Sequence, residues 1–485
     1  MAFLDAALWG GKVNIGGWTE AGGGAFDAVE PATGATLGSV GLANRDDVYR
    51  AASLAAKSQL DWAATKPEER AAVLRRAGQL WEEHAAEVQH WLTREAGSIP
   101  AKAQIETHVA ANECYEAAAL PSHPHGEVLS SDEERWSFAR RRPAGVVSVI
   151  APFNFPLVLS IRSVAPALAL GNAVLLKPDP RTAVCGGVTL MRIFEEAGLP
   201  AGVLSLLPGG AETGAAVVES PEVRVVSFTG STAAGRKVGE SAARLLKRAH
   251  LELGGNSALI VLPGADLAKA ASAGAFGSFL HQGQICMATG RHFVHDSLYD
   301  DYVAELSAKA ENLPVGDPAT SEVALGPIID EAQRDKIDCL VQDAVARGGR
   351  LTAGGSYEAL FYRPTVLADL ELDNPAFAVE IFGPVAPVTR FSSVDEVVEM
   401  VNASEYGLSV GILGDVGTAM KIADRVHSGK VHINEQTVSD EANAPFGGVG
   451  ASGTGSRFGG ATSNIDAFTE IQWLTMRSEI APYPF

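Results

Sequence analysis

Cysteine is scarce in this chain of 485 residues, which contains four, namely Cys114, Cys185, Cys286 and Cys339. They lie far apart without a C-x-x-C pair, so the sequence predicts neither a disulfide framework nor a metal site. An apolar run of about 18 residues, which a membrane-spanning helix needs, is also missing. The start, MAFLDAALWGGKVNIGG, lacks the basic and apolar segments of a secretory signal. We therefore expect a protein of the reducing cytoplasm.

Positive charge is in short supply as well. The chain has 38 Lys and Arg residues against 58 Asp and Glu residues, which gives a formal net charge of −20. An acidic surface repels phosphate backbones and anionic lipids, so we expect neither nucleic acid nor a membrane as a partner. The length exceeds that of a single ordinary core, and domain-size priors suggest roughly two or three domains.

Short apolar strands alternate with helical patterns in the middle of the chain. Strands are expected at 145–151, 172–176, 203–206, 224–228 and 249–253, with helices between them at about 157–170, 183–198, 211–219 and 233–246. This alternation predicts an α/β fold with a doubly wound parallel sheet that helices cover on both faces. A second α/β region is expected from about 257 to 440.

Helices and a terminal strand are expected on either side of this region. Asn44 is a suitable N-cap for one helix, and the apolar pattern from Pro67 predicts a second helix that ends at Gly97. A third is expected over about 100–119. The last residues are strand-like and suited to pairing with a partner subunit.

Polar residues follow two of the expected strands, at the edge where α/β proteins bind ligands. Gly230, Ser231 and Gly235 lie in a strand-to-helix turn that lets backbone N–H groups approach a phosphate. Lys177 ends another strand, where it suits a ribose or a phosphate. Taken alone, the turn equally fits a tight turn without a ligand, and the lysine more often is a solvated strand end.

Three further residues suit chemistry on a carbonyl group. Cys286 can act as a thiolate nucleophile, and Asn154, just after a strand, can donate its amide to an oxyanion. Glu252 ends an apolar strand, where a raised pKa would make it a general base near neutrality. Alone, these residues fit a buried thiol, a turn residue and a solvated carboxylate. Their joint occurrence favours a catalytic site.

Several short motifs carry a resemblance to a known family. They are PFNFP, LLKP, FTGST, ELGGN, GQIC, EIFGPV and PFGGVGASGTG. In this order and spacing they resemble the NAD(P)-dependent aldehyde dehydrogenase superfamily over essentially the whole chain. The resemblance implies oxidation of an aldehyde to the acid through a thiohemiacetal and a thioester, with hydride transfer to NAD(P). Cys286 would be the nucleophile, Asn154 and the Cys286 backbone N–H the oxyanion donors, and Glu252 the base.

The resemblance also implies a set of cofactor-binding residues. Lys177 corresponds to the adenosine-ribose lysine, Gly230 and Ser231 to the pyrophosphate turn, and Glu380 and Phe382 to the nicotinamide-ribose contacts. Further residues expected beside the cofactor are Gly235, Pro152, Phe153, Pro180, Leu253 and Gly254.

Two of these positions depart from the family pattern. Phe153 stands where the family often has Trp. Pro180 replaces a Glu that many NAD-preferring members use for the ribose 2′-hydroxyl, and Arg181 beside it can pair with a 2′-phosphate. NAD is therefore the first expectation, and NADP stays open.

The family's architecture implies three domains and an oligomer. Residues 1–120 and 144–253 are expected to bind the cofactor, and 254–440 to form the catalytic domain. Residues 121–143 and 460–485 are expected to form an oligomerisation element. A homodimer and a homotetramer both remain open.

The helix after Asn154 lines the substrate tunnel in this family, and here it looks most like the benzaldehyde, salicylaldehyde and vanillin dehydrogenase subgroup. Leu159 and Arg162 are expected near the tunnel. Further wall residues are expected at Trp91, Phe155, Ile285 and Phe446. Arg162 can hydrogen-bond a ring hydroxyl or form a surface or interface salt bridge, and both alternatives stay open. Asp440 and Glu441 near the tunnel mouth would disfavour dianionic substrates.

Other functions fit the same motifs less well. The main alternative is an aliphatic aldehyde or semialdehyde dehydrogenase. A CoA-acylating dehydrogenase typically lacks the base that Glu252 provides, and a non-catalytic binding protein on this scaffold should have lost the three catalytic residues.

Overall fold

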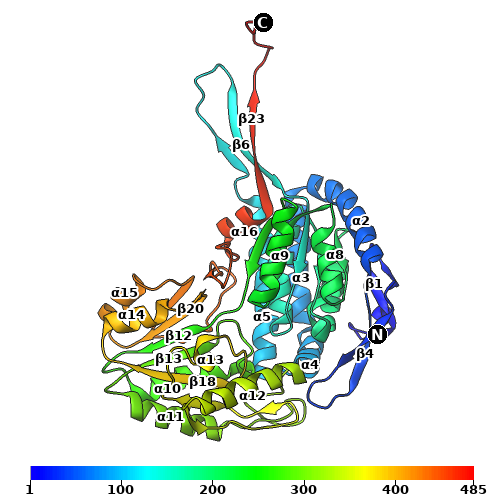
Figure 1. Ribbon diagram of the computed structural model, residues 1–485. Helices are drawn as coiled ribbons and strands as arrows, with labels where there is room; N and C mark the ends of the chain where they lie inside the picture. Colours follow the sequence, from blue (N-terminus) through cyan, green and yellow to red (C-terminus); the bar gives the residue numbers. More distant parts are fainter. Residues whose placement is uncertain (1) are drawn as a thin grey trace.

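The computed structural model describes residues 2–485, so Met1, at the start of the first expected domain, lies outside the described residues. Two bodies, each built around a largely parallel sheet, lie side by side, and a narrow arm extends away from them (Figure 1). The expected α/β fold with a doubly wound sheet is confirmed.

The first sheet has the strand order β11-β10-β7-β8-β9-β1-β2. Its parallel strands are β7 (Val146–Ile150), β8 (Ala173–Lys177), β9 (Leu204–Leu206), β10 (Val223–Thr229) and β11 (Arg248–Glu252). Strand β7 pairs with β8 on one side and with β10 on the other, so the strand order reverses beside it. Sheets of this kind bind ligands at such a reversal, outside the carboxyl ends of the strands.

Helices cover both faces of this sheet, because successive strand residues point to opposite sides. One face packs against α3 (Pro67–Glu83), α5 (Pro100–Ala119), α6 (Pro156–Ala169) and α7 (Thr189–Glu196). The other packs against α2 (Arg45–Ala64), α8 (Ala211–Glu219) and α9 (Thr232–Arg244). Val147 and Val149 of β7 therefore face the first layer, and Val146 and Ile150 face the second.

The helices that precede the sheet agree with the sequence in one case and differ in another. Asn44 caps α2, since its side chain accepts the Asp47 backbone N–H at 2.9 Å. The single helix expected from Pro67 to Gly97 is wrong, because α3 ends at Glu83 and α4 (Ala85–Ala96) starts anew. His84 leaves the helical conformation between them and stacks its ring on Phe3, with centroids 3.9 Å apart.

The second body contains the sheet β14-β17-β18-β13-β12-β20-β21. Its strands are β12 (Ser257–Val261), β13 (Thr289–His295), β14 (Arg350–Ala353), β17 (Thr365–Ala368), β18 (Val385–Phe391), β20 (Ser409–Leu413) and β21 (Lys430–Ile433). Its helices are α10 (Leu267–Phe279), α11 (Tyr299–Asn312), α12 (Glu331–Ala346), α14 (Val394–Asn402) and α15 (Val416–Ala423). The loop that carries Cys286 joins α10 to β13.

The arm is a three-stranded antiparallel sheet of β5 (Gly126–Val128), β6 (Trp136–Pro143) and β23 (Thr469–Met476) (Figure 1). Cross-strand pairing joins Trp136 to Met476, and Phe138 to both Leu474 and Val128. These residues share one face of the arm, and Trp136, Val128 and Met476 are each more than half exposed. The arm thus presents an apolar face to solvent.

Short elements complete the chain. They are α1 (Ala6–Trp9), β1 (Lys12–Asn14), β2 (Trp18–Glu20), β3 (Ala25–Val29), β4 (Thr36–Gly41), β15 (Tyr357–Glu358), β16 (Phe361–Tyr362), α13 (Pro375–Ala378), β19 (Tyr406–Gly407), β22 (Val449–Gly450) and α16 (Ala461–Phe468). None of the helices in the described part of the chain combines the length and apolar character that a membrane crossing requires.

Candidate active site

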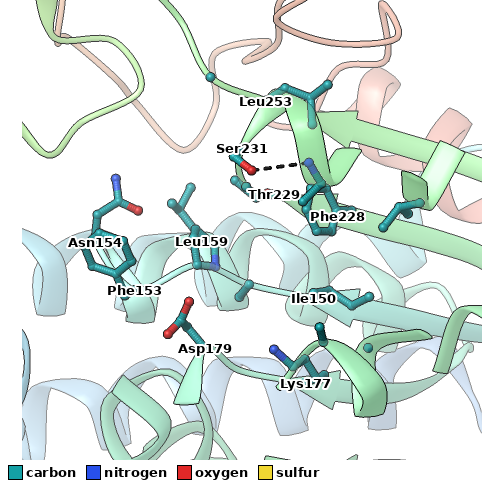
Figure 2. Close-up of a pocket in the computed structure, with 18 of the residues that line it drawn as sticks. Ile150, Phe153, Asn154, Leu159, Lys177, Asp179, Phe228, Thr229, Ser231 and Leu253 are labelled. Atoms are coloured by element: carbon teal, nitrogen blue, oxygen red, sulfur yellow. Dashed lines mark hydrogen bonds between the residues drawn. The ribbon is translucent and has the colours of Figure 1, made fainter. Parts of the chain in front are cut away.

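A cavity of about 600 Å³ lies at the carboxyl ends of the first sheet (Figure 2), and Cys286, Glu380 and Phe382 of the second body also line it. The residues that line it include Pro152, Phe153, Asn154, Leu159, Lys177, Asp179, Gly230, Ser231, Leu253, Gly254, Cys286, Glu380 and Phe382. The parallel strands bring these positions together, because their carboxyl ends meet at one edge.

One side of the cavity carries Lys177, the last residue of β8, and Asp179, which follows this strand (Figure 2). Asp179 accepts hydrogen bonds from Nε and Nη2 of Arg181, both at 2.9 Å. Arg181 also donates to Asp330 at 2.7 Å and stacks over the Phe153 ring, 4.1 Å from its centroid. The arginine expected as a possible 2′-phosphate partner is therefore held by two carboxylates.

The opposite side of the cavity carries the expected phosphate turn. Ser231 is the N-cap of α9, and its hydroxyl accepts the Ala234 N–H at 3.3 Å (Figure 2). The first N–H groups of a helix lack intrahelical partners and carry partial positive charge. Gly230 and Ser231 line the cavity beside this helix end, which suits an anionic phosphate.

Two of the expected cofactor residues lie elsewhere. A Cβ on Gly235 would stand 2.2 Å from Leu253 Cδ2, so this glycine lets α9 pack closely on the strand end. Pro180 starts a short 3-10 turn and faces a second hollow, between Phe26 and Leu360. Asp179 caps that turn by accepting the Arg181 N–H at 3.0 Å, which directs the chain away after Asp179.

Cys286 and Asn154 meet at the far end of the cavity. Cys286 is partly exposed there, in the loop between η4 (Leu280–Gly283) and β13. Asn154 is buried in the loop between β7 and α6, and its Nδ2 donates to the Gln284 carbonyl at 2.8 Å. An amide nitrogen has two hydrogens, so the second stays available to an oxyanion.

Three acidic groups near this end are shifted toward their neutral forms. Burial, aided by the Glu380 and Glu252 carboxylates, raises the pKa of the Cys286 thiol to about 12. Burial raises the pKa of Glu380 to about 7, although its carboxylate accepts the Gly255 N–H at 3.0 Å. Burial also holds the pKa of Glu252 well above its usual range, and among residues 2–485 its oxygens have no hydrogen-bond partner.

The residues expected to form the substrate wall lie in three different places. Ile285 and Phe446 are buried in one small apolar cluster, against which Phe155 and Cys286 pack. Leu159 lines the large cavity. The expected contribution of Trp91 is not supported, because this residue packs edge-on against Trp9 in the core, with ring centroids 6.0 Å apart.

Arg162 lies inside the protein rather than in a surface salt bridge. Its Nε is 3.0 Å from Glu113 and its Nη2 is 2.5 Å from Asp440. The guanidinium carbon stands 4.8 Å from the centroid of the Phe446 ring. Its buried Nη1 has no hydrogen-bond partner within residues 2–485 and can serve a polar group of a ligand.

Sequence reasoning missed several charged residues around the site. Lys430 stands 3.8 Å from Asp440 and 5.0 Å from the centroid of the Phe446 ring. Lys102, Glu106 and Glu113 of α5 are all buried. The spacing of four and seven residues in α5 places these three charges on one helix face, a signal that was available in the sequence.

The donor set of the cavity fits a dinucleotide. Lys177 and the start of α9 suit ribose and phosphate oxygens, and Glu380 and Phe382 lie beside Cys286, where a nicotinamide would have to accept hydride. A Cβ on Gly254 would stand 2.3 Å from the Glu380 carboxylate, so glycine keeps this wall open. The described residues contain no group of three or more acidic, His or Cys side chains that could hold a metal ion.

Comparisons with known proteins show which family the chain resembles. The model of the aldehyde dehydrogenase family matches residues 18–474. A vanillin dehydrogenase from Amycolatopsis sp. is 65% identical over 100% of both chains, and a benzaldehyde dehydrogenase [NAD(+)] from Pseudomonas putida is 48% identical over 99% of both. The crystal structure of a salicylaldehyde dehydrogenase from Pseudomonas putida G7 complexed with salicylaldehyde superposes with a TM-score of 0.94. It has 35% identity and covers 98% of this chain and 99% of that one.

The neighbouring carboxylates should control the reactivity of the Cys286 thiol. Glu380→Gln removes a negative charge and keeps an oxygen that can accept the Gly255 N–H, so the thiol pKa should fall. We expect alkylation of Cys286 by iodoacetamide at pH 8 to become up to about tenfold faster for each unit of pKa. Exposed Cys339 on α12, followed by peptide mass spectrometry in the same sample, is the internal control. An unchanged Cys286 rate would contradict the electrostatic coupling.

Proposed function

The chain belongs to the aldehyde dehydrogenase family, and from this premise we propose that it oxidises an aromatic aldehyde of the benzaldehyde, vanillin or salicylaldehyde type to the carboxylic acid, with NAD as oxidant. The proposal rests on one observation. The Asn154 amide donates to the backbone carbonyl two residues before Cys286 and so joins the loops that carry Asn154 and Cys286. The names of the similar enzymes support an aromatic substrate.

The chemistry starts at Cys286. Its thiol loses a proton to solvent water, and the thiolate sulfur forms a bond to the aldehyde carbon as the carbonyl π bond breaks. This gives a thiohemiacetal, whose oxyanion accepts hydrogen bonds from the Asn154 amide and the Cys286 backbone N–H. The bound dinucleotide supplies the oxidant that accepts the hydride from this carbon. A thioester on Cys286 remains.

Water then releases the acid. Glu252 takes a proton from a water molecule that attacks the thioester, and the carbon–sulfur bond breaks to free Cys286. Burial holds the pKa of Glu252 well above that of a solvated carboxylate, which makes it a stronger base once it is ionised. This step separates the proposed reaction from CoA-dependent acylation, in which a second thiol resolves the thioester.

The surroundings of Cys286 support an aromatic substrate. Apolar side chains pack against the cysteine, and Arg162 lies over Phe446 with a buried N–H available. An apolar pocket with one or two placed polar groups suits an aromatic ring with a hydroxyl substituent. Asp440 and Glu113 offset the charge of Arg162, so a carboxylate of a semialdehyde gains less from this arginine.

A panel of aldehydes tests this function. We expect benzaldehyde, vanillin and salicylaldehyde to exceed short aliphatic aldehydes and succinate semialdehyde in kcat/KM, measured by the absorbance of the reduced cofactor. Cys286→Ala should abolish turnover, whereas Cys339→Ala, which removes an exposed thiol on α12, should retain it. Higher kcat/KM for short aliphatic aldehydes would refute the aromatic assignment, and full activity of Cys286→Ala would refute the mechanism.

Asp179 supports NAD over NADP. Its carboxylate lines the cavity near Lys177, where it can accept a ribose hydroxyl and would repel a 2′-phosphate. The same carboxylate and Asp330 hold Arg181, which reduces its value for a phosphate.

Asp179→Asn should therefore shift the cofactor preference toward NADP. The amide keeps the cap on the following turn and removes the charge, and we expect the ratio of kcat/KM for NAD to that for NADP to fall roughly tenfold. Asp330→Asn, which also loosens Arg181 but lies outside the wall of this cavity, is the matched control. Equal shifts in both variants would assign the effect to Arg181, and a wild-type preference for NADP would overturn the NAD assignment.

The domain boundaries expected from the sequence are part of this proposal, with 1–120 and 144–253 around the cofactor and 254–440 as the catalytic unit. Residues 121–143 and 460–485 contain the arm, whose apolar face exposes Val128, Trp136 and Met476. Such a face on an edge-stranded sheet favours a second copy of the chain as its partner.

Charge on this face should weaken the assembly. We expect the wild-type protein to elute as a dimer or tetramer in size-exclusion chromatography with light scattering, and Val128→Glu with Met476→Glu to shift it toward smaller species, because burying two carboxylates is costly. Val416→Glu, at an exposed apolar residue on α15 far from the arm, should leave the mass unchanged (Figure 1). A wild-type monomer would exclude the oligomer.

A further inference from the structure

Helix α5 contains a buried ion pair that the proposed chemistry does not use. Lys102 and Glu106 are 1% and 0% exposed, and Lys102 Nζ is 2.5 Å from Glu106 Oε2. Their spacing of four residues places them on one face of the helix. Burial lowers the pKa of Lys102 and raises that of Glu106, and each charge opposes the shift of the other. A pair this deeply buried is costly unless further hydrogen bonds satisfy both groups.

Those further bonds all go to the segment that carries Asn154. Lys102 Nζ donates to the Asn154 carbonyl at 2.8 Å and stands 4.3 Å from the centroid of the Phe155 ring. Glu106 Oε1 accepts the Leu157 N–H at 2.8 Å and the Val158 N–H at 3.4 Å, at the start of α6. The pair therefore holds the backbone on both sides of Phe155.

The same segment is held from the nucleophile's side. The Asn154 amide donates to the Gln284 carbonyl, and the Phe155 ring meets the His281 ring edge-on at 5.6 Å. Asn154 is thus fixed by its carbonyl toward Lys102 and by its side chain toward the loop of Cys286. With the backbone and one amide hydrogen fixed, the direction of the second amide hydrogen is fixed too.

We propose that Lys102 and Glu106 are positioning residues that set the Asn154 amide for oxyanion stabilisation. This inference rests on the proposed function, since it assigns the pair a part in the same reaction. Glu106 alone satisfies the N–H groups at the start of α6, so capping that helix does not require a buried lysine. The bond from Lys102 to the Asn154 carbonyl is separate from the capping of α6 and acts directly on the residue that would donate to the oxyanion.

Replacement of the lysine tests the proposal. Lys102→Met keeps the apolar length of the side chain and removes the donor, and we expect kcat to fall roughly 10- to 100-fold with little change in KM for NAD. Asn154→Ala removes the oxyanion donor itself and should lower kcat about 100- to 1,000-fold. If Lys102 acts through Asn154, adding Lys102→Met to Asn154→Ala should cost little more.

A matched control separates positioning from stability. Arg70 on α3 is likewise buried and donates from Nε to the Ala169 carbonyl at 3.0 Å, at the other end of α6. Arg70→Met should lower the melting temperature but leave kcat unchanged. If Lys102→Met does not fold, the double variant Lys102→Met with Glu106→Gln is measured instead. It leaves no unpaired buried charge, and the glutamine oxygen can still accept the Leu157 N–H.

Two readouts distinguish the possible failures. Alkylation of Cys286 by iodoacetamide needs no oxyanion donor and should stay unchanged in Lys102→Met. Additive losses in the cycle with Asn154, or a loss of kcat no larger than that of Arg70→Met, would overturn the positioning role. If the wild-type protein oxidises no aldehyde, the proposed function fails instead, and alkylation still reports an intact thiol.

Discussion

The parallel pairing of β7 with β8 on one side and with β10 on the other is the constraint on which the site depends. It sends the segments after these strands, and the last residue of β11, to one edge of the sheet. Asn154, Lys177, Ser231 and Glu252 are separated by up to 98 residues of sequence and still border one region, because each follows or ends a strand of this sheet. The second body then adds Cys286 and Glu380 from across the edge.

Burial of its acidic groups gives that edge its chemical character. Cys286, Glu252 and Glu380 are acids in low-dielectric surroundings, and each negative charge that forms makes the next one more costly. The three groups therefore favour their neutral forms. Ionisation of one of them raises the pKa of the others, so their protons leave in a coupled order. Burial of these side chains maintains this state, since a fully hydrated surface would screen the charges and weaken the coupling.

The strands of the first sheet and the residues after them could be predicted from the sequence, because short apolar runs alternate there with amphipathic helical patterns. Short apolar runs such as GVVSVIA that alternate with helical patterns are typical of strands buried on both faces, and the polar residue that follows each run then lies at the ligand edge. The break at His84 escaped this reasoning, since the apolar pattern continues through it, whereas His84 leaves the helical conformation and stacks on Phe3. The expectation for Trp91 came from the resemblance to the family, and the structure instead packs this residue against Trp9.

The buried charges of α5 show where pattern reading stops. Lys102, Glu106 and Glu113 lie on one helix face, which normally indicates a solvated surface, yet all three are buried. Their partners are the Asn154 carbonyl, the N-terminus of α6 and Arg162, which come from a distant part of the chain. A helix can bury a charged face only where a neighbouring segment offers hydrogen-bond or ionic partners to those charges. A charged face on a buried, alanine-rich helix therefore indicates a neighbour with free backbone groups or a guanidinium group. In this protein that neighbour is the segment from Asn154 into α6.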